Sequence, residues 1–117
     1  MLESSSLTSY TRYASLENKC VFITGGATGI GAALVEAFVA QNAKVFFVDI
    51  NRVAAESLCQ KLAKVGLYKP RFFDCDVSDI PKLKDVIASL QNEAGSVDVL
   101  INNAANDQRY ETQKITE

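Results

Sequence analysis

The stretch VFITGGATGIG, residues 21–31, joins an apolar run to a cluster of glycines. Its first three residues are β-branched or aromatic, which is typical of a buried strand, and helical spacing of apolar residues resumes over residues 32–40. Three of the four glycines between the two segments permit a tight turn and the close approach of a ligand: Gly25, Gly29 and Gly31. The first N–H groups of such a helix lack internal partners and lie at the positive end of its dipole. The stretch therefore predicts a strand, a turn and a helix that bind a phosphate group.

The composition of the 117-residue chain is that of a globular protein with at most one domain, with 48% hydrophobic and 22% charged residues. The formal net charge of -2 provides no broad positive field, so we expect neither nucleic acid nor an anionic membrane as a partner. No stretch approaches the length of a membrane span, and the first residues lack the features of a signal peptide. We therefore expect a cytoplasmic protein.

The cysteines and the absence of histidine limit the possible chemistry. Cys20, Cys59 and Cys75 are not spaced like metal ligands and are expected to be reduced, buried thiols. The chain contains no histidine, which excludes histidine-based zinc sites, Ser-His-Asp triads and Cys-His dyads within it. We expect no metal site.

Apolar runs alternate along the chain with segments of helical periodicity. Strands are expected near residues 19–23, 44–50, 71–77 and 97–101, and helices near 32–40, 52–65 and 78–95. Because strands alternate with helices, we expect right-handed βαβ units and a parallel sheet in an α/β fold.

Several details of the helices are also predicted from the pattern. The first helix is expected to bury one face composed of Ile30, Leu34, Ala37, Phe38 and Gln41. Asn42 and Gly66 occupy positions typical of left-handed residues that end a helix. Ser78 is expected to cap the third helix, with Asp79 in its first turn and Gly95 at its end.

Two motifs carry a resemblance to a known family. TGGATGIG, residues 24–31, resembles the cofactor loop T-G-x-x-x-G-I-G of the short-chain dehydrogenase/reductase family. NNAA, residues 102–105, resembles its N-N-A-G signature, with Ala105 in place of the glycine. The resemblance covers residues 16–105. It implies a Rossmann-type doubly wound parallel sheet of four strands in the order 3-2-1-4, with three helices and a ligand crevice between the first and fourth strands.

The resemblance assigns cofactor contacts to the glycine loop and to the end of the second strand. The loop residues are Gly25, Thr28, Gly29, Ile30 and Gly31, and the strand-end residues are Asp49 and Ile50. Asp49 lies 24 residues after Gly25, close to the spacing at which a carboxylate accepts hydrogen bonds from the adenosine ribose. A carboxylate there would repel a 2′-phosphate. The expected cofactor is therefore NAD rather than NADP.

The ends of the third and fourth strands complete the predicted site. Asp76 and Val77 resemble the D-V pair with which the family contacts adenine. Asp74 lies two residues earlier, so spacing alone leaves open which carboxylate reaches the adenine. The fourth strand contributes Asn102, Asn103 and Ala104.

No catalytic residue is assigned in this chain. In the family, a Ser and a Tyr followed by Lys four residues later lie downstream of N-N-A-G. Tyr110 and Lys114 have the Tyr-Lys spacing but follow NNAA directly, which indicates coincidence. We expect a flexible lead-in over residues 1–17, an NAD(P)-binding Rossmann segment over 18–105 and a polar tail over 106–117, truncated before the catalytic half.

The resemblance implies an NAD(P)-dependent oxidoreductase that transfers hydride between nicotinamide and an alcohol or carbonyl. Residues 106–109 weakly resemble a segment of family members that act on sugars and polyols. We expect this chain alone to be inactive, and the full-length form to bind a small-molecule substrate and to be a homo-oligomer. The alternative is a non-catalytic dinucleotide-binding or redox-sensing module that acts through a partner. A methyltransferase on a related sheet is less consistent with the loops.

Overall fold

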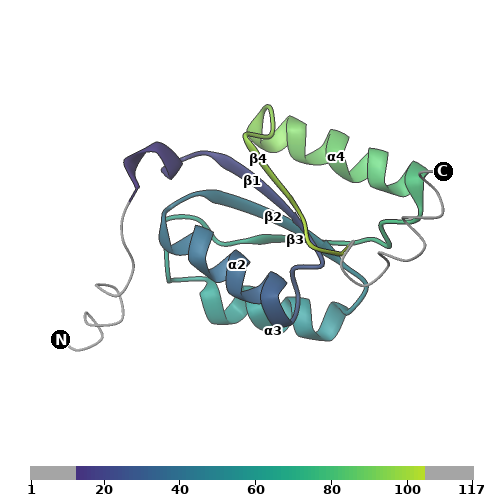
Figure 1. Ribbon diagram of the computed structural model, residues 1–117, viewed down its shortest axis with the longest axis horizontal. Helices are drawn as coiled ribbons and strands as arrows, with labels where there is room; N and C mark the ends of the chain where they lie inside the picture. The colour runs from purple at the N-terminus through teal and green to yellow at the C-terminus, as the bar shows by residue number, and fades with distance from the viewer. Residues whose placement is uncertain (1–12, 105–117) are drawn as a thin grey trace.

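The computed structural model describes residues 13–104, which form a parallel sheet with helices on both faces (Figure 1). The strands are β1 (Cys20–Thr24), β2 (Lys44–Asp49), β3 (Arg71–Asp74) and β4 (Val99–Asn102). Their order in the sheet is β3-β2-β1-β4, which confirms the predicted order 3-2-1-4 and the Rossmann-type fold. Within this part of the chain, no helix is both long and apolar enough to cross a membrane.

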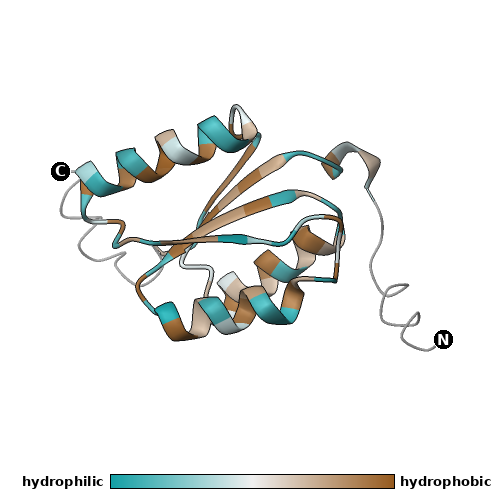
Figure 2. Ribbon diagram, turned by 180° about the vertical axis from the view of Figure 1, so that it is seen from behind, coloured by the Kyte–Doolittle hydropathy of each residue, from teal (hydrophilic) through white to brown (hydrophobic). Residues whose placement is uncertain are grey.

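The side chains of the two central strands alternate between two hydrophobic cores. One core lies under α2 (Gly29–Ala40) and α3 (Arg52–Leu62), and the other lies under α4 (Ile80–Ala94) on the opposite face (Figure 1). The strand side chains in the first core are Val21, Ile23, Val45 and Phe47, and those in the second are Cys20, Phe22, Phe46 and Val48. Because both faces are covered, β1 and β2 are mostly hydrophobic along their length (Figure 2).

The buried face of α2 differs from the predicted one. Gly31, Val35 and Val39 are buried at intervals of four residues, whereas Ile30 is 68% exposed. Gln41 is buried as predicted, and Leu34 and Phe38 are half-buried against the core, so the buried side of α2 is rotated by about one residue from the predicted face. The physical reason is the close packing of Gly31 on the backbone of Gly25, which fixes the rotation of the helix about its axis.

Two helix ends depend on the backbone conformation of the expected residue. Asn42 has φ 65°, which confirms its predicted left-handed role after α2. Gly66 was predicted in the same role after α3, but its φ is not positive. A Cβ on Gly66 would lie 2.0 Å from the carbonyl oxygen of Val39. Gly66 is therefore required for close packing against the end of α2 rather than for the turn.

The start of α4 also differs from the prediction. The cap is Asp79, whose Oδ1 accepts a hydrogen bond from the backbone N–H of Lys82 at 3.2 Å, rather than Ser78. Ser78 instead donates its backbone N–H and its hydroxyl to Asp76. The predicted end of the helix is confirmed, because Gly95 follows α4 with φ 82°.

The residues that precede β1 contact the body of the fold. Ala14–Leu16 form a short 3-10 helix, η1, and the backbone N–H of Tyr13 donates to Oε1 of Gln41 at 2.8 Å. Several predictions fall outside the described residues. They concern residues 1–12, Ala105, residues 106–109, and the pair Tyr110 and Lys114.

Candidate functional site

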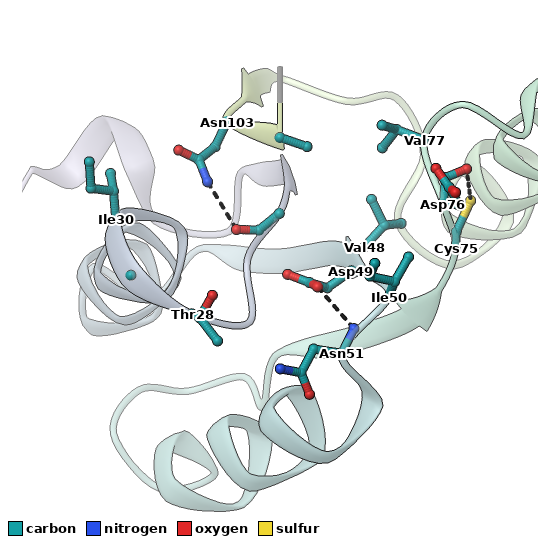
Figure 3. A pocket seen from close by; sticks show the side chains of 13 residues that line it. Thr28, Ile30, Val48, Asp49, Ile50, Asn51, Cys75, Asp76, Val77 and Asn103 are labelled. Atoms are coloured by element: carbon teal, nitrogen blue, oxygen red, sulfur yellow. Dashed lines mark hydrogen bonds between the residues drawn. The ribbon is translucent and has the colours of Figure 1, made fainter. Parts of the chain in front are cut away.

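A cleft of about 540 Å³ lies at the carboxyl ends of the strands, where open α/β sheets bind their ligands (Figure 3). The predicted site residues that line it are Gly25, Thr28, Gly29, Ile30, Asp49, Ile50, Asp76, Val77, Asn103 and Ala104. Gly31 and Asn102 do not line the cleft. The fold thus brings segments from all four strand ends to one place.

The glycine loop closes the end of the cleft next to α2. Gly25 and Gly29 have φ 69° and 59°, which favours glycine at both positions. A Cβ on Gly31 would lie 1.8 Å from the carbonyl oxygen of Gly25, so Gly31 supports the loop from beneath. Thr28 occupies the N-cap position, but its side chain makes no capping hydrogen bond. The positive end of the α2 dipole is therefore available to an anion in the cleft.

The Asp49 carboxylate joins the glycine loop to the start of α3. Its Oδ2 accepts from the backbone N–H of Ala27 at 2.9 Å, and its Oδ1 accepts from the backbone N–H of Asn51 at 3.0 Å. Each carboxylate oxygen keeps a further lone pair, so Asp49 can also accept hydrogen bonds from ligand hydroxyls. The neighbouring Ile50 is 71% exposed and provides apolar surface beside the carboxylate.

The structure separates the two carboxylates near the end of β3. Asp76 lines the cleft, and its Oδ1 accepts from the backbone N–H and the hydroxyl of Ser78 at 2.9 and 2.8 Å. These hydrogen bonds lower the pKa of Asp76, so it is ionised at neutral pH. Asp74 instead pairs with Arg52 at 2.9 Å and does not line the cleft. The strand ends at Asp74, so the alternation that would place both carboxylates on one side does not continue.

Residues 102–104 are held to β1 by hydrogen bonds. Thr24 Oγ1 donates to Asn102 Oδ1 and accepts from the backbone N–H of Ala104, both at 3.0 Å. Asn103 Nδ2 donates to the carbonyl oxygen of Gly25 at 3.0 Å. Asn102 therefore fastens β4 to β1 instead of lining the cleft.

Replacing Thr24 with valine should lower the free energy of unfolding by about 1–2 kcal/mol, because Asn102 Oδ1 and the N–H of Ala104 lose their partner while the side chain keeps its shape. Urea unfolding measures the change. The matched control is Thr28→Val, since Thr28 is exposed and its side chain caps nothing. An effect of Thr24→Val no larger than that of the control would contradict the fastening role.

Three further residues line the cleft and were not predicted: Val48, Asn51 and Cys75. Asn51 could have been found from the sequence, because an asparagine directly before a predicted helix is a typical N-cap residue. In the structure, its Oδ1 accepts a hydrogen bond from the backbone N–H of Ala54 at 3.1 Å. Val48 and Cys75 are buried, and no sequence pattern distinguishes them from other core residues. Burial raises the pKa of the Cys75 thiol, which therefore remains protonated at neutral pH.

The cleft combines groups suited to the parts of a dinucleotide. A helix start for phosphate lies at one end, the Asp49 carboxylate lies in the middle with Ile50 beside it, and a second carboxylate, Asp76, lies at the other end with Val77 beside it (Figure 3). The volume of the cleft also lies within the range of small-molecule and cofactor sites.

The sequence is similar to known sugar dehydrogenases. It is 39% identical over 107 residues to the protein named "Probable galactose dehydrogenase GalD" of Rhizobium meliloti, covering 92% of this chain and 42% of that protein. It is 41% identical over 104 residues to D-xylose 1-dehydrogenase of Caulobacter vibrioides, covering 89% of this chain and 40% of that protein. The chain thus spans about two fifths of the length of these curated relatives.

The fold is also similar to that of a solved structure, and the sequence matches a family model. Aldohexose dehydrogenase of Thermoplasma acidophilum, in its ligand-free form, matches with a TM-score of 0.61 and 32% identity, covering 78% of this chain and 31% of that chain. A family model described as short chain dehydrogenase matches residues 19–117. This match extends over most of the sequence and agrees with the sheet order and the glycine loop. The chain therefore belongs to the short-chain dehydrogenase family, whose members are oxidoreductases with a nicotinamide cofactor.

Proposed function

We propose that this chain binds NAD in preference to NADP, as the cofactor-binding part of an oxidoreductase that acts on a sugar or related polyol. The observation that carries the proposal is the Asp49 carboxylate, which lines the cleft and is hydrogen-bonded to the glycine loop. This arrangement suits a ligand with a phosphate and a ribose hydroxyl close together.

The residues of the cleft would each hold one part of the dinucleotide. Gly25, Thr28 and Gly29, supported by Gly31, would hold the pyrophosphate at the start of α2, with Ile30 beside it. Asp49 would accept hydrogen bonds from the adenosine ribose. The adenine would lie between Ile50 and Val77 and donate to Asp76. Asn103 and Ala104, fastened through Asn102, would line the path of the cofactor past β4.

The preference for NAD follows from charge. NADP differs from NAD by a phosphate on the 2′-oxygen of the adenosine ribose, and Asp49 would repel that phosphate. The glycine loop, residues 24–31, contains no Lys or Arg that would offset the repulsion.

The chemistry that we propose for the complete protein is hydride transfer between the nicotinamide ring of the bound cofactor and a sugar alcohol or carbonyl group. The names of three similar proteins support a sugar, because they are galactose, D-xylose and aldohexose dehydrogenases. The family resemblance places the catalytic Ser, Tyr and Lys in the part of the relatives that this chain does not match. We therefore expect these 117 residues to bind cofactor without detectable turnover of a sugar.

The test compares NAD binding by the wild-type chain and by Asp49→Asn, using isothermal titration calorimetry. We expect saturable binding by the wild type and affinity weaker by on the order of tenfold for the variant. The asparagine loses the charge, and its NH₂ group faces one of the two N–H donors that now bind the carboxylate. Thermal melting of both proteins separates a local effect from unfolding.

The matched control is Asp85→Asn, which removes the same charge from the exposed surface of α4 and should leave NAD affinity unchanged. Absence of NAD binding by the wild type would contradict the cofactor function. Turnover of a sugar by this chain alone would contradict the proposal that these 117 residues bind cofactor but lack the catalytic residues. NAD binding by a complete protein that oxidises no sugar would favour the non-catalytic module.

A further inference from the structure

An arginine beside the cleft is held between two carboxylates. Arg52 is the first residue of α3 and directly follows Asn51, which lines the cleft. Its Nη1 lies 3.2 Å from Glu56 Oε2, one helical turn further along α3. Its Nη2 lies 2.9 Å from Asp74 Oδ2, at the end of β3. Neither Arg52 nor Asp74 lines the cleft.

The position of Arg52 matters because an arginine near this strand end is the group that can accommodate a 2′-phosphate. Its planar guanidinium binds phosphate oxygens in pairs when it is free to do so. Here both terminal nitrogens are already bound to carboxylates. The hydrogen bonds to Glu56 and Asp74 also raise the pKa of Arg52, so the guanidinium is charged at neutral pH.

We propose that Asp74 is a positioning residue that sets the cofactor preference of this chain, by holding Arg52 away from the ribose end of the cleft. The proposal rests on the proposed function, since it assumes that a dinucleotide occupies the cleft. It gives Asp74 a role distinct from that of Asp76, which lies in the cleft itself. Asp49 excludes the 2′-phosphate by repulsion, and Asp74 removes the cation that would attract it.

Asp74 is better placed than Glu56 to fix the guanidinium. The contact with Glu56 lies along one helix between two side chains that are each 58% exposed, and such pairs are weak. The contact with Asp74 instead crosses from α3 to β3, and Asp74 is the less exposed carboxylate, at 40%. The Arg52 guanidinium carbon also lies 5.9 Å from the centre of the Phe72 ring, on the same strand as Asp74. Both contacts direct Arg52 toward β3.

The test is a double-mutant cycle on the 117-residue chain with Asp74→Asn, Arg52→Gln and the two changes combined. Isothermal titration calorimetry gives the Kd of each protein for NAD and for NADP. In Asp74→Asn, we expect the ratio of the NADP Kd to the NAD Kd to fall by about fivefold, because Arg52 Nη2 loses its carboxylate partner and only the weak contact with Glu56 then competes with the added phosphate. A general structural defect would weaken both cofactors alike and leave the ratio unchanged.

The Arg52→Gln background separates the proposed mechanism from the loss of one negative charge. In the Arg52→Gln background, Asp74→Asn should leave the ratio of the NADP Kd to the NAD Kd unchanged. Arg52→Gln alone should change this ratio little relative to the wild type. The matched control is Glu93→Gln, which breaks a similar exposed ion pair with Arg71 at the other end of β3. This control should not change the ratio.

The possible outcomes are distinguishable. Binding of NAD with a ratio that is the same in Asp74→Asn and in the wild type would overturn the inference and leave the proposed function intact. An equal fall of the ratio with and without Arg52 would also overturn it, because charge alone would then be responsible. Loss of NADP affinity in Arg52→Gln alone would mean that Arg52 already reaches the phosphate. Binding of neither cofactor by the wild type would overturn both proposals.

Discussion

Replacing Gly31 with alanine should destabilise the fold by about 3 kcal/mol and weaken NAD binding by more than about tenfold. The added Cβ would lie 1.8 Å from the carbonyl oxygen of Gly25 and 2.9 Å from Asn103 Nδ2. The first of these atoms belongs to the backbone, so the glycine loop or the whole of α2 must move. Because Asn103 donates to that same carbonyl, the connection to β4 is disturbed as well.

The measurements are urea unfolding for stability and calorimetry for NAD. Gly29→Ala is the matched control for stability, since Gly29 has φ 59° and no atom within 4 Å of an added Cβ. That variant should lose only about 1 kcal/mol, the cost of a left-handed alanine. A loss in Gly31→Ala as small as that in Gly29→Ala would contradict the tight packing of the loop on α2.

Replacing Phe47 with alanine should lower the free energy of unfolding by about 4 kcal/mol. Phe47 lies in the middle of β2, is completely buried in the core beneath α2 and α3, and has its ring centre 5.5 Å from that of Phe72. Since small domains are stable by only about 5–15 kcal/mol, this loss would leave the variant close to unfolding. Thermal melting and urea unfolding test the expectation.

Phe47 also supports the glycine loop, because a Cβ on Gly26 would lie 2.8 Å from the Phe47 side chain. We therefore expect Phe47→Ala to loosen the loop as well as the core. The control Phe73→Ala removes a half-buried ring from β3 and should cost less. Equal losses of unfolding free energy in the two variants would contradict the larger contribution of Phe47 to the core.

The order of elements and the grouping of the candidate site residues around one cleft were predictable from the sequence. Alternating apolar runs and helical segments indicated the parallel sheet, and polar or glycine residues after each run marked the strand ends that meet at the cleft. The strand order needed the family resemblance, because the same elements can be wound in more than one way. The pairing register, such as Phe22 opposite Phe46, could be obtained only from the structure.

The errors arose where local patterns allow more than one structure. Nearly every residue from 30 to 40 is apolar or small, so periodicity could not fix the buried face of α2, and the contact of Gly31 with Gly25 decided it. A glycine after a helix usually indicates a left-handed turn, but Gly66 serves close packing instead. Ser78 was expected to cap α4, but its hydroxyl donates to Asp76, and Asp79 caps the helix instead.

The Asp49 carboxylate has a consequence for attempts to redesign the proposed cofactor preference. One of its oxygens anchors the glycine loop through Ala27, and the other anchors the start of α3 through Asn51. A substitution at residue 49 that is meant to admit a 2′-phosphate therefore also releases two backbone anchors, and it would be accompanied by a looser glycine loop. Engineering that begins at Arg52 and Asp74 leaves both anchors in place.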